Sequence, residues 1–327
     1  MTAISSTSTS HSHSQSGASK FFSFLLRHNI ALVFVGLLIA ASLISSSFLT
    51  ERNITNILRQ IAGLGILSMG MLLVILTRGI DLSVGSVAAC GSVVCALALG
   101  SYGLPGALVG SLGVGCLFGG VAGFLVAYRK IPPFVVTLAM MTIARGITYL
   151  ISNGHPIFVS EKGALLLAFD KGSIFGLPLP VILMLVVIGV FTFMLQFTSF
   201  GRLVTAIGSN EEAVRLSGIQ VTRYIFATYV IAGACSALAG IVNTARSTVG
   251  SPVFGIGLEL DVIASVVIGG ASLNGGRGTA LNTFIGVLIL AVINNIMNLT
   301  NVSGYYQMVV KGLIILIAVG LQSSKRS

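Results

Sequence analysis

Apolar runs about twenty residues long make up most of the chain, and this pattern leaves few folds open. A helix needs about 20 mainly apolar residues to cross the hydrocarbon core of a bilayer. Only 8% of the 327 residues are charged and the mean hydropathy is +1.02, whereas about 25% of residues are charged in a typical soluble domain. The sequence therefore predicts an all-α membrane protein, a polytopic helical bundle with almost no soluble domain.

About ten membrane-spanning segments fit the apolar runs. They are residues 29–49, 57–77, 83–101, 104–127, 133–152, 177–196, 224–245, 259–270, 279–298 and 305–321. The eighth segment is short, and a re-entrant element is the alternative there. Residues 1–22 are rich in Ser and Thr and are expected to form a disordered cytoplasmic tail. Residues 23–327 are expected to form a single transmembrane domain.

The positions of lysine and arginine predict the orientation, because cytoplasmic loops carry an excess of both. With the N-terminus inside, eleven of these residues fall on the cytoplasmic side, five fall outside and two lie within spans. Both termini are therefore expected in the cytoplasm. The net charge of +10 is spread between the apolar runs, which suits anionic lipid headgroups and gives no indication of nucleic-acid binding.

A polar stretch, Thr77–Ser86, interrupts two of the longest apolar runs. Ionisable residues are costly in lipid, so they usually face a bundle interior, a watery path or an interface. We expect a broken helix or tight loop that lines a transport path, and a short polar loop outside the membrane is the alternative. The candidate pathway residues in this stretch are Thr77, Gly79, Asp81, Ser83 and Gly85.

The loop at about residues 197–223 is expected inside the cell and has the features of a short helix. Asn210 is suited to the N-cap, two acids follow where the helix dipole favours them, and a glycine can end the helix. Such a helix fits a groove on a partner, and a helix that lies on the membrane surface is the alternative. The candidate residues are Asn210, Glu211, Glu212, Ala213, Arg215 and Gly218.

Two further features are candidates for gating and solute binding. The glycine-rich stretch at 269–279 is a second break, with Gly269, Gly270, Gly275, Gly276 and Gly278 as candidate gating or packing glycines. Asn294 and Asn298 are four residues apart and share one helix face. They are suited to hydrogen-bond a polyhydroxylated solute, and a bond to another helix is the alternative.

No set of residues typical of an enzyme or a metal site is found. The four histidines are not near a candidate nucleophile and carboxylate, and the four cysteines lie in apolar segments without metal-ligand spacing. No glycine-rich loop ends in Gly-Lys-Ser or Gly-Lys-Thr, so ATP binding through a P-loop is not expected. The sequence predicts a transport subunit with no catalytic residues and no metal.

Four motifs in order resemble the membrane permeases of bacterial ABC monosaccharide importers. They are Ile75–Ser86, Gly208–Gly218, Gly269–Gly278 and Tyr305–Gly312. The likeness is greatest to the ribose-type group, whose members carry ribose, arabinose, galactose, xylose or allose, and it extends from about residue 25 to 322. Arg78 departs from the pattern, since a small polar residue is expected there.

The resemblance implies a multi-pass permease of the bacterial inner membrane that imports a monosaccharide, with ribose as the first expectation. The implied partners are a second permease copy, ABC ATPase subunits docked on the helix around Asn210–Ile219, and a periplasmic or lipid-anchored sugar-binding protein. ATP and Mg would be bound by the ATPase, so this chain itself needs no cofactor. Movement of the docking helices would rearrange the chain around Gly79–Gly85 and Gly269–Gly278.

Two alternatives remain. A permease of the same family for an autoinducer sugar or a nucleoside is the nearer one. A secondary transporter driven by protons or sodium belongs to another class and would need carboxylates in the membrane, for which Asp81, Glu259 and Asp261 are the candidates.

Overall fold

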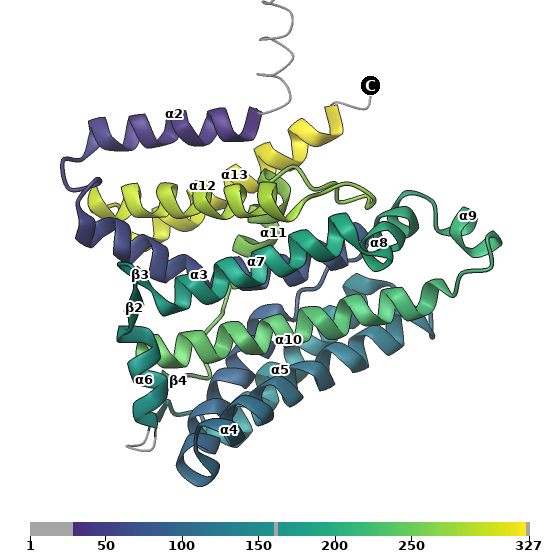
Figure 1. Ribbon diagram of the computed structural model, residues 1–327, viewed down its shortest axis with the longest axis horizontal. Helices are drawn as coiled ribbons and strands as arrows, with labels where there is room; N and C mark the ends of the chain where they lie inside the picture. Colours follow the sequence, from purple (N-terminus) through teal and green to yellow (C-terminus); the bar gives the residue numbers. More distant parts are fainter. Residues whose placement is uncertain (1–28, 160–162, 325–327) are drawn as a thin grey trace, which may run out of the picture.

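The computed structural model describes residues 29–159 and 163–324 as a helical bundle (Figure 1). The tail predicted for residues 1–22 lies outside the described residues. The helices are α2 (Asn29–Ile44), α3 (Glu51–Leu76), α4 (Val84–Ala127), α5 (Pro133–Ser152), α6 (Ala164–Lys171), α7 (Leu179–Phe197), α8 (Ser199–Ser209), α9 (Glu211–Leu216), α10 (Val221–Ser247), α11 (Leu258–Ile268), α12 (Ala280–Leu299) and α13 (Gly304–Ser324).

Two pairs of very short strands accompany the helices. Strand β1 (Ile157–Phe158) pairs antiparallel with β4 (Val249–Gly250), and β2 (Ser173–Ile174) pairs antiparallel with β3 (Leu177–Pro178). In Figure 1 these strands lie with α6 at one end of the bundle, while α8 and α9 lie at the other. We call these the α6 end and the α9 end.

Six of the described helices are long and apolar enough to cross a membrane: α3, α4, α5, α7, α10 and α12. Helix α4 has 44 residues and would be roughly 66 Å long if straight, about twice the thickness of the hydrocarbon core. It is kinked at Gly103, where φ is 65°, with Pro105 just beyond. The kink falls between the predicted segments 83–101 and 104–127. The total of about ten spans stays a prediction.

Helix α11 corresponds to the short eighth segment of the sequence analysis. Its 11 residues extend about 16 Å, which is too little to cross a bilayer alone. A non-helical stretch from Ser251 to Gly257 precedes it. This stretch lies against the start of α4, since a Cβ on Gly85 would overlap the carbonyl oxygen of Gly255. A short helix and an irregular segment therefore replace one continuous span.

Helices α4 and α10 pack so closely that their backbones touch. A Cβ on Gly115 would overlap the carbonyl oxygen of Gly233, and one on Gly119 would overlap the carbonyl oxygen of Tyr229. Small residues allow this approach. Lipid is as apolar as the helix surfaces, so close van der Waals packing, and not the hydrophobic effect, holds such helices together. The apolar outer faces of α2, α5 and α7 are exposed, as shown by Leu43, Leu150 and Phe197. Such faces suit contact with lipid.

Candidate functional site

The polar break begins where α3 ends. The N–H of Gly79 and the hydroxyl of Thr77 both donate to the carbonyl of Val74, each at 2.9 Å. Arg78 takes the left-handed conformation with φ of 65°, which usually favours glycine at a helix end. Its guanidinium points to another helix: Nε donates to the carbonyl of Gly208 and Nη2 to that of Ser209, both at 2.7 Å.

These contacts belong to a junction of three segments, which we define as Leu76–Arg78, Gly208–Ser209 and Gly275–Gly276. The N–H of Gly276 donates to the carbonyl of Leu76 at 3.0 Å. A Cβ on Gly208 would overlap both of these backbone groups. The end of α3, the end of α8 and the glycine-rich loop are therefore held together by backbone contacts and by Arg78. The polar break and the glycine-rich loop each contribute predicted residues to this junction, and Asn210 follows it directly in the chain.

The remaining candidate glycines lie around the same loop. Gly269 packs on the first turn of α12, where a Cβ would lie 2.6 Å from the carbonyl oxygen of Asn282. Gly270 has a φ of 85°, and Gly278 lies next to Leu72 and Ala271. The positions are compatible with close packing, and gating by these glycines stays a prediction.

The rest of the break is buried. Asp81 is 2% exposed, and its Oδ1 accepts hydrogen bonds from the N–H of Ser83 at 2.8 Å and the hydroxyl of Ser83 at 2.6 Å. Helix α4 begins at the next residue, so the carboxylate shapes the start of that helix. Gly79 lies against the buried hydroxyl of Tyr229, which has no hydrogen-bond partner among the described residues. Irregular backbone at membrane depth requires this kind of burial.

Replacing Asp81 with alanine is expected to lower solute uptake and thermal stability. The change leaves the buried N–H and hydroxyl of Ser83 without their acceptor, which costs about 1–3 kcal/mol. Uptake in membranes with matched amounts of inserted chain is the measurement. Asp81→Asn keeps an acceptor and serves as the matched variant. Normal uptake in Asp81→Ala would contradict a role for the break in transport.

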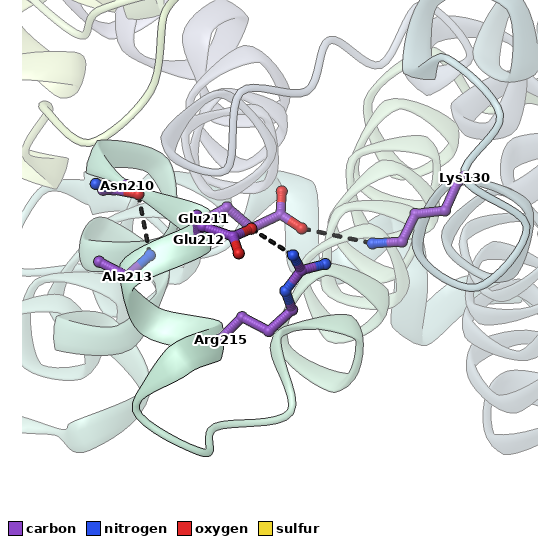
Figure 2. Close-up of polar contacts among 6 residues, drawn as sticks. All are labelled: Lys130, Asn210, Glu211, Glu212, Ala213 and Arg215. Atoms are coloured by element: carbon purple, nitrogen blue, oxygen red, sulfur yellow. Dashed lines mark hydrogen bonds and ion pairs between the residues drawn. The ribbon is translucent and has the colours of Figure 1, made fainter.

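Helix α9 projects from the α9 end and has the cap that the sequence predicts (Figure 2). Oδ1 of Asn210 accepts from the N–H of Ala213 at 3.0 Å. Nζ of Lys130 lies 3.4 Å from Oε1 of Glu211, which links α9 to the loop between α4 and α5. Glu212 pairs with Arg215, and this hydrogen bond raises the pKa of Arg215.

The far side of α9 is open to solvent. Leu216 is 79% exposed, and Gly218 beyond it takes a φ of 80° that turns the chain toward α10. An exposed short helix with charged ends and an uncovered leucine is suited to contact another protein. Two residues with contacts here, Gly208 and Lys130, were not among the candidate site residues of the sequence analysis, although Gly208 begins one of its four motifs.

Asn294 and Asn298 lie far from the break. Near them, the side chains of Asn53 and Asn295 exchange two hydrogen bonds, at 3.0 and 2.8 Å, which places this part of α12 beside the start of α3. The break follows the end of α3, roughly 35 Å away along the helix. Asn298 accepts from Gln307 at 2.9 Å, whereas Oδ1 of Asn294 is buried without a partner among the described residues. The structure does not bring the two predicted pathway groups together.

No group of three or more His, Cys, Asp or Glu side chains in the described ranges is placed to hold a metal ion. A hollow at the α9 end has a volume of about 550 Å³ and lies over the junction. Its lining includes Arg78, Asn274 and Arg277, and no acidic residue. This arrangement suits contact with polar or acidic groups.

The chain matches one family model and many full-length relatives. The model is described as branched-chain amino acid transport system / permease component and matches residues 53–319. The ribose import permease protein of Bacillus subtilis is 44% identical over 88% of this chain and 90% of its own length. That of Escherichia coli K12 is 41% identical over 93% and 95%. The L-arabinose transport system permease protein of Escherichia coli K12 is 38% identical over 97% and 96%.

No solved structure matches the chain. The bacterial permease relatives and the six apolar helices identify a multi-pass protein of the bacterial inner membrane. The family model covers far more than half of the sequence, so the chain belongs to the family described as branched-chain amino acid transport system / permease component.

Proposed function

We propose that the chain is the permease subunit of an ATP-binding-cassette importer and carries a monosaccharide across the inner membrane, with ribose as the first candidate. The observation that carries this proposal is the similarity to ribose import permease proteins, at 41–44% identity over about nine-tenths of the chain. The family description names amino acids. However, the relatives at 38–44% identity are named for ribose, L-arabinose and D-allose.

The proposed topology has about ten spans and both termini in the cytoplasm, with the α9 end inside. It is supported by the direction of the outer helices, since α2 runs away from the α9 end and α13 runs toward it (Figure 1). The proposed partners are a second permease copy, the ABC ATPase, a periplasmic or lipid-anchored sugar-binding protein and membrane lipid. In this proposal ATP and Mg are bound by the ATPase, and the chain itself has no catalytic role and no cofactor. A nucleic-acid partner is not part of the proposal.

The proposed mechanism follows the contacts of the junction. The ATPase docks on α9, and its closure on ATP moves α9 together with α8. The end of α8 is bonded to Arg78 and packed against the glycine-rich loop, so its movement reaches both breaks at once. The candidate pathway, formed by the break around Asp81 and by Asn294 and Asn298, would then open alternately to the two sides.

The ion-driven alternative is less well supported, because two of the three candidate carboxylates already have partners. Asp81 is bonded to Ser83, and Oδ2 of Asp261 lies 2.8 Å from Nζ of Lys311 on α13. The deciding experiment co-expresses the chain with candidate ATPase and binding protein and purifies the complex through this chain. One sugar that raises ATP hydrolysis and is imported supports the proposal. Uptake without ATPase subunits that an uncoupler abolishes would overturn it.

Replacing Glu212 with lysine is expected to uncouple transport while the chain folds normally. The pair with Arg215 is exposed to solvent and therefore contributes little to the stability of the fold. The new positive charge would repel the surface that accepts an acidic helix end. We expect at least a tenfold loss of ribose-stimulated ATP hydrolysis in the assembled complex.

Glu51→Lys is the matched control for this charge reversal. Glu51 is also an exposed acid in the first turn of a helix, but that turn lies at the opposite end of α3 from the junction. The control should retain stimulation. Equal stimulation in both variants would count against docking on α9.

A further inference from the structure

A cavity of about 110 Å³ lies between α3, α10 and the start of α11, toward the α6 end. Its polar lining consists of Arg59 and Gln60 from α3, and Asn243 and Arg246 from α10. Phe254 and Leu258 line it from the irregular stretch and the first turn of α11. The cavity is separate from the junction and from the break.

Most of these polar groups have no partner in the described part of the protein; Gln60 and Arg246 are solvent-exposed residues, and Arg59 and Asn243 are half-buried. Within the described residues, the side chains of Gln60, Asn243 and Arg246 make no hydrogen bond or ion pair. Arg59 has one loose contact, with Nη1 at 3.5 Å from Oδ2 of Asp170 on α6, and its Nε is buried without a partner. The cavity wall therefore presents free donors from guanidinium and amide groups and free acceptors from amide oxygens.

The position of these groups indicates function. Arg59 lies eight residues into α3, about 12 Å from its start, in a helix long and apolar enough to span the membrane. Ionisable residues in such helices are costly and usually mark a solute or ion path. The neighbouring α11 is a short helix preceded by irregular backbone, and transporters commonly bind solutes beside discontinuous helices of this kind.

We propose that this cavity is a monosaccharide-binding site on the import route. A sugar hydroxyl both donates and accepts, so a neutral polyol can satisfy the amide oxygens and the guanidinium groups together. Phe254 and Leu258 supply apolar contact for the C–H face of the ring. A water molecule takes about 30 Å³ in the liquid, so the cavity of about 110 Å³ corresponds to about four waters, whose places sugar hydroxyls would take. The inference rests on the proposed function and locates its solute.

The absence of tryptophan from the chain allows a direct test. Phe254→Trp would place a single fluorescent reporter in the cavity wall, and Phe197→Trp would place one on the exposed face of α7 as a control. The full-length chain is purified in lipid nanodiscs and titrated with ribose, leucine and inorganic phosphate. We expect a saturable change with ribose at the cavity reporter only. Asn243→Leu, similar in size without the amide, should weaken this response at least tenfold.

The same substitution is then measured in the assembled importer. Asn243→Leu should lower ribose uptake at least tenfold at matched amounts of assembled complex. This measurement decides the matter if the tryptophan variant does not fold. Normal uptake by Asn243→Leu, or a cavity reporter that answers to leucine or phosphate and not to ribose, would overturn the inference. An unmodified complex that imports no monosaccharide would instead overturn the proposed function.

Discussion

Replacing Gly208 with alanine is expected to abolish solute uptake and to destabilise the chain. The added Cβ would overlap the carbonyl oxygen of Leu76 and the backbone nitrogen of Gly276. Neither is the flexible end of a side chain, so α8 would have to move away from α3, and the hydrogen bonds of Arg78 would be lost with it. Overpacking typically costs about 1–3 kcal/mol, and we expect the upper part of that range or more here. Thermal unfolding and uptake are the measurements.

Gly146→Ala is the matched control, because it makes the same chemical change in a helix. A Cβ on Gly146 meets no atom within 4 Å. Alanine is favoured over glycine in a helix by up to about 1 kcal/mol, so this variant should keep its uptake and melt at the same or a higher temperature. A Gly208→Ala variant that behaves like Gly146→Ala would show that the backbone at Gly208 is not held this close to Leu76 and Gly276.

Replacing Arg78 with glycine is expected to separate transport from ATP hydrolysis. Two effects on stability oppose each other. Glycine relieves the left-handed backbone of residue 78, which costs a larger residue about 1–3 kcal/mol. The substitution also removes both hydrogen bonds to the end of α8. The melting temperature should therefore change little, whereas the link between α8 and the break is lost. We expect the sugar imported per ATP hydrolysed to fall at least tenfold in reconstituted vesicles.

Two further variants sharpen this prediction. Arg277→Ala removes a positive charge from the same hollow, but the Arg277 side chain makes no hydrogen bond or ion pair within the described part of the chain. Arg277→Ala should leave the amount of sugar imported per ATP hydrolysed unchanged. Arg78→Lys keeps the charge without the planar fork that reaches two carbonyls, so its ratio should fall between the other two. An unchanged ratio in Arg78→Gly would mean that movement reaches the break by another route.

The sequence predicts local features of this protein well. Asn210 caps α9 as expected, because capping depends on residues within one turn. The separation of segments 83–101 and 104–127 coincides with a kink, because glycine and proline mark such points locally. The resemblance to ribose-type permeases is confirmed by the full-length relatives.

Contacts between distant residues were not predictable in the same way. The partners of Arg78 on α8 are 130 and 131 residues away in the sequence. Helical spacing places Asn294 and Asn298 on one face but does not say which helix that face meets. The loose pair of Arg59 and Asp170 joins two residues that lie 111 positions apart in the sequence. Packing of the whole bundle decides all of these contacts.

The backbone contact between α4 and α10 has a consequence for electrical insulation. A water molecule needs about 10–15 Å³, and at Gly115 and Gly119 the facing carbonyls of α10 leave no room even for a methyl group. A continuous chain of water molecules, along which protons could move, cannot form between α4 and α10 at this contact. An inner membrane holds a voltage that the cell uses for other work, and this contact closes one route by which ions could leak through the bundle.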